Sequence, residues 1–190
     1  MDLGLTGKKA LVTGSTKGIG RAIAETLLDE GATVAICARN ADEVETAVSE
    51  LEAKGHVYGS AVDAEDLKSL EAWISSASTA LGGIDIYIHN TSAKPQKQLE
   101  DWSKNFNVDL IALVGGVTAA KDALSSGGGS VISIGTTATS EHFASGSGSY
   151  SAFKAAVTNW TLGQAQVLGA LGIRCNVVSP GPIWIEGGDW

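Results

Sequence analysis

The 190-residue sequence has little cysteine and few basic residues. Its two cysteines, Cys37 and Cys175, lie in separate apolar segments and lack the spacing of a zinc site or a disulfide framework, so we expect two reduced core thiols. The three histidines, His56, His89 and His142, also lack metal-ligand spacing, which argues against a metal enzyme. With 13 Lys and Arg against 21 Asp and Glu, the net charge of -8 argues against a nucleic-acid surface, which needs clustered cations.

Long apolar runs are absent as well. No stretch is long enough to cross a bilayer, and the N-terminus lacks the pattern of a secretory signal. We therefore expect a cytoplasmic protein with neither a membrane nor a nucleic acid as partner. A chain of this length with 44% hydrophobic residues buries one core, so we expect a single domain over residues 1–190.

Short β-branched runs alternate with amphipathic segments along the chain. This pattern predicts an α/β fold, a doubly wound Rossmann-type parallel sheet with helices on both faces. The expected strands are 9–12, 33–38, 56–61, 84–89, 130–134 and 173–178. The expected helices are 18–30, 41–54, 66–81, 99–124 and 149–171.

The first expected strand leads directly into the segment TGSTKGIG, and a helix follows. Glycines at a strand-to-helix turn let the backbone approach a pyrophosphate, which the N–H groups and dipole of the helix N-terminus then bind. A tight turn in a glycine-rich chain is the alternative. The setting favours a dinucleotide site formed by Gly14, Ser15, Thr16, Lys17, Gly18, Ile19 and Gly20.

The glycine spacing resembles the cofactor loop of the short-chain dehydrogenase/reductase family, TGxxxGIG, and the segment from Tyr150 to Lys154 is similar to that family's YxxxK element. The resemblance covers nearly the whole chain and is nearest to the 3-oxoacyl carrier-protein reductase-like members. It implies an oxidoreductase that transfers a hydride between a nicotinamide and a small-molecule carbonyl or alcohol substrate.

The end of the second expected strand, Ala38-Arg39-Asn40, has no acidic residue. An acid there accepts hydrogen bonds from the ribose hydroxyls and repels a 2′-phosphate. Arg39 and Lys17 therefore favour NADP(H) over NAD(H), unless both are solvated surface cations. For Asp63, after the third strand, the resemblance implies contact with the adenine; a helix cap is the alternative.

The resemblance implies two further contributions to the cofactor site. Asn90, the one match to the family's NNAG in the segment HNTS, would line the cofactor wall. After the last strand, Pro180 and Gly181 resemble a turn beside the nicotinamide, where the Ile183 backbone would hold the carboxamide. Family members continue beyond this point, so we expect a truncated form, in which Trp184 and Trp190 begin an apolar lid over the substrate.

A spacing of four residues places Tyr150 and Lys154 on one face of a helix, although a surface pair is the alternative. A carbonyl that receives a hydride needs a proton donor, and a tyrosine with its ordinary pKa near ~10 is poorly matched to neutral pH. A neighbouring ammonium lowers that pKa, so we expect Tyr150 to donate the proton and Lys154 to poise it. The resemblance adds a hydrogen bond from Lys154 to the nicotinamide ribose.

Two positions depart from the family pattern. The family's substrate-binding Ser becomes Thr136, with Thr137 as a rival, and a loop hydroxyl that caps its own backbone is the alternative. The family's VNL, whose Asn organises a water in the proton relay, reads VDL, so Asp109 either accepts from that water or disturbs Lys154. His142 and Phe143 either line the pocket or pack within a loop.

The resemblance also implies that the helices containing Asp109 and Tyr150 pair across a two-fold axis, which gives a homodimer or a higher homo-oligomer. The alternative function is a catalytically weak nucleotide-binding protein with a regulatory or assembly role. The replacements at Thr136 and Asp109 and the short C-terminal part favour it, while Tyr150 and Lys154 argue against it.

Overall fold

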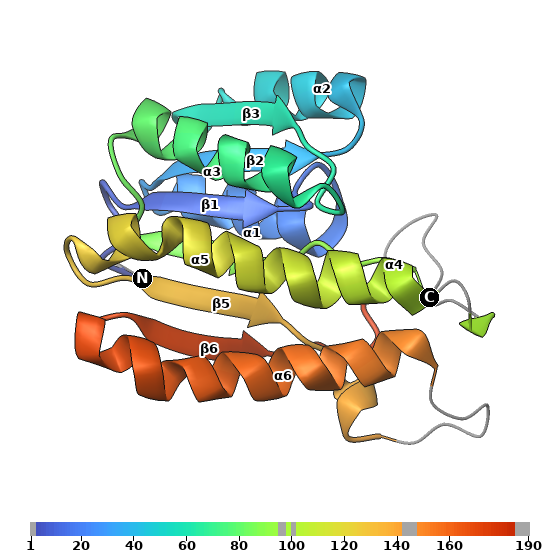
Figure 1. Ribbon diagram of the computed structural model, residues 1–190. Helices are drawn as coiled ribbons and strands as arrows, with labels where there is room; N and C mark the ends of the chain where they lie inside the picture. The colour runs from blue at the N-terminus through green and yellow to red at the C-terminus, as the bar shows by residue number, and fades with distance from the viewer. Residues whose placement is uncertain (1–2, 95–97, 100–101, 142–147, 185–190) are drawn as a thin grey trace.

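The computed structural model describes residues 3–94, 98–99, 102–141 and 148–184. Strands and helices alternate along the chain (Figure 1). The strands are β1 (Lys9–Thr13), β2 (Thr33–Ala38), β3 (Val57–Ala61), β4 (Ile86–His89), β5 (Ser130–Ile134) and β6 (Arg174–Val178). The helices are α1 (Gly18–Asp29), α2 (Ala41–Leu51), α3 (Leu67–Leu81), α4 (Trp102–Asn105), α5 (Ala112–Ser125) and α6 (Ser149–Leu168), with short helices η2 (Phe106–Ile111), η3 (Thr137–Thr139) and η4 (Gly169–Leu171).

The six strands form one parallel sheet in the order β3-β2-β1-β4-β5-β6. The chain winds outward from β1 to β3 and then returns to β4 on the other side of β1, so the strand order reverses between β1 and β4. Figure 1 shows α3, α5 and α6 on the near face of the sheet, with α1 and α2 behind it. The predicted doubly wound Rossmann-type fold is confirmed, and its ligand edge lies at the carboxyl ends of the strands.

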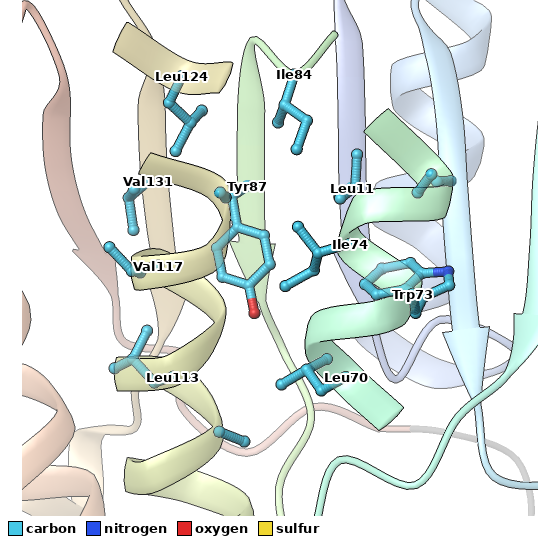
Figure 2. Close-up of a cluster of buried hydrophobic side chains, with 14 of the residues drawn as sticks. Leu11, Leu70, Trp73, Ile74, Ile84, Tyr87, Leu113, Val117, Leu124 and Val131 are labelled. Atoms are coloured by element: carbon cyan, nitrogen blue, oxygen red, sulfur yellow. The ribbon is translucent and has the colours of Figure 1, made fainter. Parts of the chain in front are cut away.

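Both faces of the sheet carry a hydrophobic core, which explains why the central strands are almost continuously apolar. Figure 2 shows the larger cluster, where Tyr87 of β4 projects from the sheet between Val117 of α5 and Ile74 of α3, and Leu11 of β1 lies on the far side of Ile74. The second cluster packs Val12 and its neighbours in the sheet against α1 and α2. Within the described ranges, no helix has the length and apolar character that a membrane span requires.

The two cysteines lie on strands separated by three others. Cys37 in β2 and Cys175 in β6 are both buried and free, as the sequence predicted. Burial raises the pKa of Cys37 to about 12. Because the thiolate is the reactive form, Cys37 is a packing residue.

The prediction of a single regular helix over residues 99–124 is wrong. α4 continues into the π-helical turn η2, and α5 begins only at Ala112. A π-helical turn holds an extra residue, and such turns occur mostly at functional sites. Here the turn brings Val108 and Asp109 into the interior. The bounds of the other expected elements differ from those in the structure by up to three residues at one end. Helix ends ordinarily vary by one or two residues between assignments.

The close packing of Tyr87 against α5 gives a first prediction. A Cβ atom at Gly116 would overlap the hydroxyl of Tyr87, whose side chain is fully buried. Gly116→Ala should therefore lower the free energy of unfolding by about 1–2 kcal/mol, because overpacking outweighs the gain in helix propensity. Urea denaturation measures the change.

Gly163 provides the matched control within a helix. It is exposed in α6, and an added Cβ would meet nothing within 4 Å. Gly163→Ala should raise the free energy of unfolding by up to ~1 kcal/mol. Equal effects of the two substitutions would contradict the role given to Tyr87.

Candidate active site

The loop between β1 and α1 has a backbone that only glycine fits at three positions. Gly14 and Gly18 have φ angles of 63° and 60°, in the left-handed region. A Cβ at Gly20 would overlap the carbonyl of Gly14 and the side-chain amide of Asn90. The loop therefore lies close against the end of β4, at the point where the strand order reverses.

The N-terminus of α1 lacks a side-chain cap. Its N-cap residue, Lys17, makes no capping hydrogen bond, whereas Asn40 caps α2 and Asp66 caps α3. The N–H groups and the dipole of the first turn of α1 thus fit a pyrophosphate. This observation supports the predicted dinucleotide site.

Two residues of the predicted site, Ser15 and Asn90, hold this loop in place through side-chain hydrogen bonds. Ser15 is buried, and its hydroxyl donates to the Val12 carbonyl (2.7 Å) and accepts from the Cys37 amide (3.2 Å). Asn90 donates from Nδ2 to the carbonyls of Thr13 (3.1 Å) and Gly14 (2.7 Å). Ser15 and Asn90 therefore fix the glycine loop to β2 and β4.

The charged groups near the end of β2 include a carboxylate that the sequence analysis missed. The ammonium of Lys17 lies 3.6 Å from the Glu43 carboxylate, which also accepts from the Thr16 hydroxyl at 3.3 Å. Arg39 is exposed immediately after β2. Glu43 lies in the first turn of α2, and only the fold brings that turn back beside the glycine loop.

Asp63 follows β3 at the same edge of the sheet and is exposed. Its carboxylate accepts from the Glu65 amide (3.0 Å) and its carbonyl from the Asp66 amide (3.0 Å), which makes a turn. Asp66 is the N-cap of α3, so the interpretation of Asp63 as the helix cap is wrong.

Tyr150 and Lys154 lie in the first part of α6, with the ammonium 5.9 Å from the centre of the tyrosine ring. Burial raises the pKa of Tyr150, a hydrogen bond with the Thr136 side chain lowers it, and the charge of Asp109 raises it. The net shift is upward, so the lowering expected from the neighbouring ammonium is wrong. Thr136 is buried and is the N-cap of η3, where its hydroxyl also accepts from the Ala138 amide at 3.3 Å. The rival, Thr137, is only half-buried.

Lys154 is almost fully buried, with 1% of its surface exposed. Its ammonium donates to the Ile134 carbonyl at the end of β5 (2.8 Å) and lies 3.4 Å from Oδ1 of Asp109. Burial lowers the pKa of Lys154, and the Asp109 carboxylate opposes that shift. One of its three N–H groups remains for a further acceptor beyond these two contacts.

The Asp109 carboxylate is fully buried and receives three more donors. The Ser92 hydroxyl donates to Oδ1, and the Ala93 amide (3.3 Å) and Asn105 Nδ2 (2.9 Å) donate to Oδ2. With Lys154 included, the four acceptor positions of the carboxylate are occupied by protein groups. Asp109 thus contacts Lys154 directly, where the sequence suggested either a bound water or a disturbance. Ser92 and Asn105 were missed, although Asn105 lies one helical turn before Asp109.

His89, the last residue of β4, is fully buried beside this pair. Burial and the charge of Lys154 lower its pKa to about 3, although the backbone of Asp109 and Val108 favours its charged form. His89 is therefore neutral across the physiological range.

The segment after β6 runs toward the glycine loop. Pro180 follows the strand and its carbonyl accepts from the Thr137 amide at 3.1 Å, while Gly181 is exposed. Ile183 and Trp184 lie with Ile19 and other α1 side chains around an apolar groove of about 640 Å³. Trp190, His142 and Phe143 lie outside the described residues.

The carboxyl edge of the sheet thus brings together a phosphate-binding loop, a tyrosine, a buried ammonium and a hydroxyl. Such a set can bind a dinucleotide and pass a proton to or from an oxygen atom. Among residues 3–94, 98–99, 102–141 and 148–184, no cluster of three or more His, Cys, Asp or Glu is arranged to hold a metal ion.

Comparisons with known proteins agree with this fold. The family model for short chain dehydrogenase matches residues 8–186. Isoepoxydon dehydrogenase of Penicillium expansum is 34% identical over 197 residues, which covers 100% of this chain and 76% of that protein. The 3-oxoacyl-acyl-carrier-protein reductase of Vibrio harveyi is 31% identical, over 94% of this chain and 75% of that protein.

Among solved structures, L-sorbose reductase from Gluconobacter frateurii, complexed with NADPH and L-sorbose, superimposes with a TM-score of 0.91 at 29% identity. The match covers 97% of this chain and 73% of that one. The chain therefore belongs to the short-chain dehydrogenase/reductase family, whose members are oxidoreductases that bind nicotinamide cofactors.

Proposed function

We propose that this chain is an NADP(H)-dependent dehydrogenase or reductase that acts on a small-molecule carbonyl or alcohol, with Tyr150 and Lys154 at the centre of its chemistry. The observation that carries the proposal is the Tyr150–Lys154 pair, which lies at the same edge of the sheet as the glycine loop. No observation on the described residues favours a catalytically weak regulatory protein.

In the proposed reaction, the bound nicotinamide supplies or accepts the hydride. In reduction, Tyr150 donates its proton to the developing alkoxide oxygen. The Thr136 hydroxyl, which already contacts Tyr150, orients the same oxygen. Lys154 holds the tyrosine ring and uses its remaining N–H on the nicotinamide ribose.

We propose that residues 1–190 form one dinucleotide-binding domain. The pyrophosphate would be bound by backbone N–H groups of the glycine loop, with Lys17 and Arg39 at a 2′-phosphate. The adenine would contact Asp63. The remaining contacts would come from Gly14, Ser15, Thr16, Gly18, Ile19, Gly20, Asn90, Pro180, Gly181 and Ile183, of which Ser15 and Asn90 act by holding the loop in shape.

The proton donor provides the next prediction. Tyr150→Phe keeps the ring and removes the hydroxyl, so it should lower kcat for carbonyl reduction by about 10²- to 10⁴-fold and leave NADPH affinity within about twofold. Thr136→Ala should lower kcat by a smaller factor, because it removes only a hydroxyl that orients the substrate. NADPH oxidation over a panel of ketones and aldehydes, with calorimetry for cofactor binding, measures both. Full activity of Tyr150→Phe would show that the active site is assigned wrongly.

Cofactor preference provides a separate prediction. NADPH should bind more tightly than NADH, and Arg39→Asp should reverse the preference, because it replaces an attractive charge by a repulsive one. Glu43→Gln should strengthen NADPH binding several-fold and leave NADH binding nearly unchanged, since it releases Lys17 from the carboxylate. Equal affinity of the unmodified chain for both cofactors would refute the preference.

We further propose that the chain forms a homodimer through η2, α5 and α6. Phe153 of α6 contacts the rings of Trp102 and Phe106, with centroids 6.2 and 5.8 Å away, and Phe106 is still 40% exposed. Phe106→Glu should convert the dimer to a monomer in sedimentation velocity. Leu3→Glu, at an apolar residue that is 51% exposed elsewhere, should leave the dimer intact. A monomeric unmodified chain would contradict this proposal.

A further inference from the structure

The surroundings of Asp109 consist only of hydrogen-bond donors. Oδ1 faces the Ser92 hydroxyl and the Lys154 ammonium at 3.4 Å, and Oδ2 faces the Ala93 amide and Asn105 Nδ2. Both oxygens are fully buried, so no water competes for these positions. The four donors come from the loop after β4, from α4 and from α6.

The side chain of Asn105 is held by hydrogen bonds at both its nitrogen and its oxygen. Its Nδ2 donates to the Ala93 carbonyl (3.1 Å) as well as to Asp109, and its Oδ1 accepts from the Ser149 hydroxyl (2.7 Å). Asn105 is fully buried, and Ser149 directly precedes Tyr150. This single side chain therefore joins the Asp109 carboxylate to the start of the helix that carries Tyr150.

An asparagine at position 109 would not satisfy this environment. The Lys154 ammonium and the Ala93 amide can only donate. Whichever way the amide of such an asparagine turned, its NH₂ group would face one of them. A buried donor left without an acceptor destabilises the folded protein. The site is thus built for a carboxylate, and the departure from the family's VNL is matched by the surrounding donors.

We infer that Asp109 is the fixed counter-ion of Lys154, that Asn105 is the positioning residue that orients it, and that the neutralised pair sets the ionisation of Tyr150. The inference rests on the proposed function and deepens it, because it names the groups that control the proposed proton donor. Ser92 and the Ala93 amide complete the carboxylate's contacts.

The groups around the phenol show how the ion pair acts on Tyr150. Tyr150 faces Lys154 on its own helix, Asp109 on η2 and the Thr136 hydroxyl, and His89 on β4 is neutral at these pH values. Burial raises the pKa of Tyr150, the Thr136 hydrogen bond lowers it, and the charge of Asp109 raises it further. The Asp109 carboxylate therefore favours the protonated phenol, against the Lys154 ammonium, which favours the phenolate.

The bound nicotinamide would supply the hydride and become oxidised as its C–H bond breaks, and the groups described here account for the proton. The carbonyl carbon gains the hydride and forms a C–H bond, and the π electrons of the C=O bond move to the oxygen. That oxygen takes the proton of Tyr150, which leaves a phenolate. The phenolate then regains a proton from solvent, so reduction requires the phenol and fails as pH rises above its pKa.

The ionisation of Tyr150 in the cofactor-free protein tests the inference without any substrate. The tyrosinate ultraviolet difference spectrum is followed against pH, and the same titration of Tyr150→Phe identifies the Tyr150 signal. Asp109→Asn should lower the midpoint by about one unit, because the uncompensated ammonium favours the phenolate. Asn105→Leu should lower it by less, since Asp109 stays charged but is less well oriented; a merely structural residue would not move it.

A charge relocation provides the matched control. In Asn105→Asp/Asp109→Asn, the carboxylate at position 105 accepts from the amide at position 109 and from Ser149 but faces the Ala93 carbonyl, so thermal stability should stay below that of the unmodified protein. The carboxylate is then one contact further from Lys154, so the Tyr150 midpoint should stay below that of the unmodified protein.

An unchanged or higher midpoint in Asp109→Asn, or a gain in its thermal stability, would overturn the inference. Once a substrate is known, the alkaline limb of kcat for reduction should move to lower pH in Asp109→Asn. A chain that reduces no carbonyl refutes the proposed function, while the titration still reports on the counter-ion.

Discussion

The ion pair between Asp109 and Lys154 is the constraint on which the active-site edge depends. Both side chains are buried, and removing either charge from its partner in such a setting is strongly destabilising. The protein offsets the cost of desolvation with hydrogen bonds from three separate elements. The π-helical turn η2 places Asp109 inward, the end of β5 provides a carbonyl for Lys154, and Asn105 connects the pair to Ser149. The position of Tyr150 follows from these contacts.

The cofactor side of the edge depends on a different constraint, the reversal of strand order between β1 and β4. The reversal leaves the loop after β1 beside the end of β4, and the side chains of Ser15 and Asn90 hold it there. Glycines permit this approach at Gly14 and Gly20. Because the ion pair and the loop meet the same end of the sheet, the proposed proton donor and the proposed dinucleotide site lie at one edge.

The sequence predicted the fold because strands buried on both faces are continuously apolar and alternate with amphipathic helices. It also predicted the glycine loop and the Tyr150–Lys154 spacing, since both are local patterns. It did not find Glu43, Ser92 or Asn105, because each acts through a contact with a distant segment of the chain. The sequence also did not predict the π-helical turn, because the spacing of its apolar residues does not differ enough from that of a regular helix. The role of Asp109 stayed open from the sequence, because the donors around it lie on other segments of the chain.

Hydride transfer to a carbonyl, with Tyr150 as the acid, is the central claim. Incubation of the chain with a reducible ketone and NADPH deuterated at the transferable position of the nicotinamide tests it most directly, with mass spectrometry of the alcohol. The account predicts one deuterium on the former carbonyl carbon for the unmodified protein and almost no labelled alcohol for Tyr150→Phe. Unlabelled alcohol from the unmodified protein, or equal labelled product from Tyr150→Phe, would contradict it.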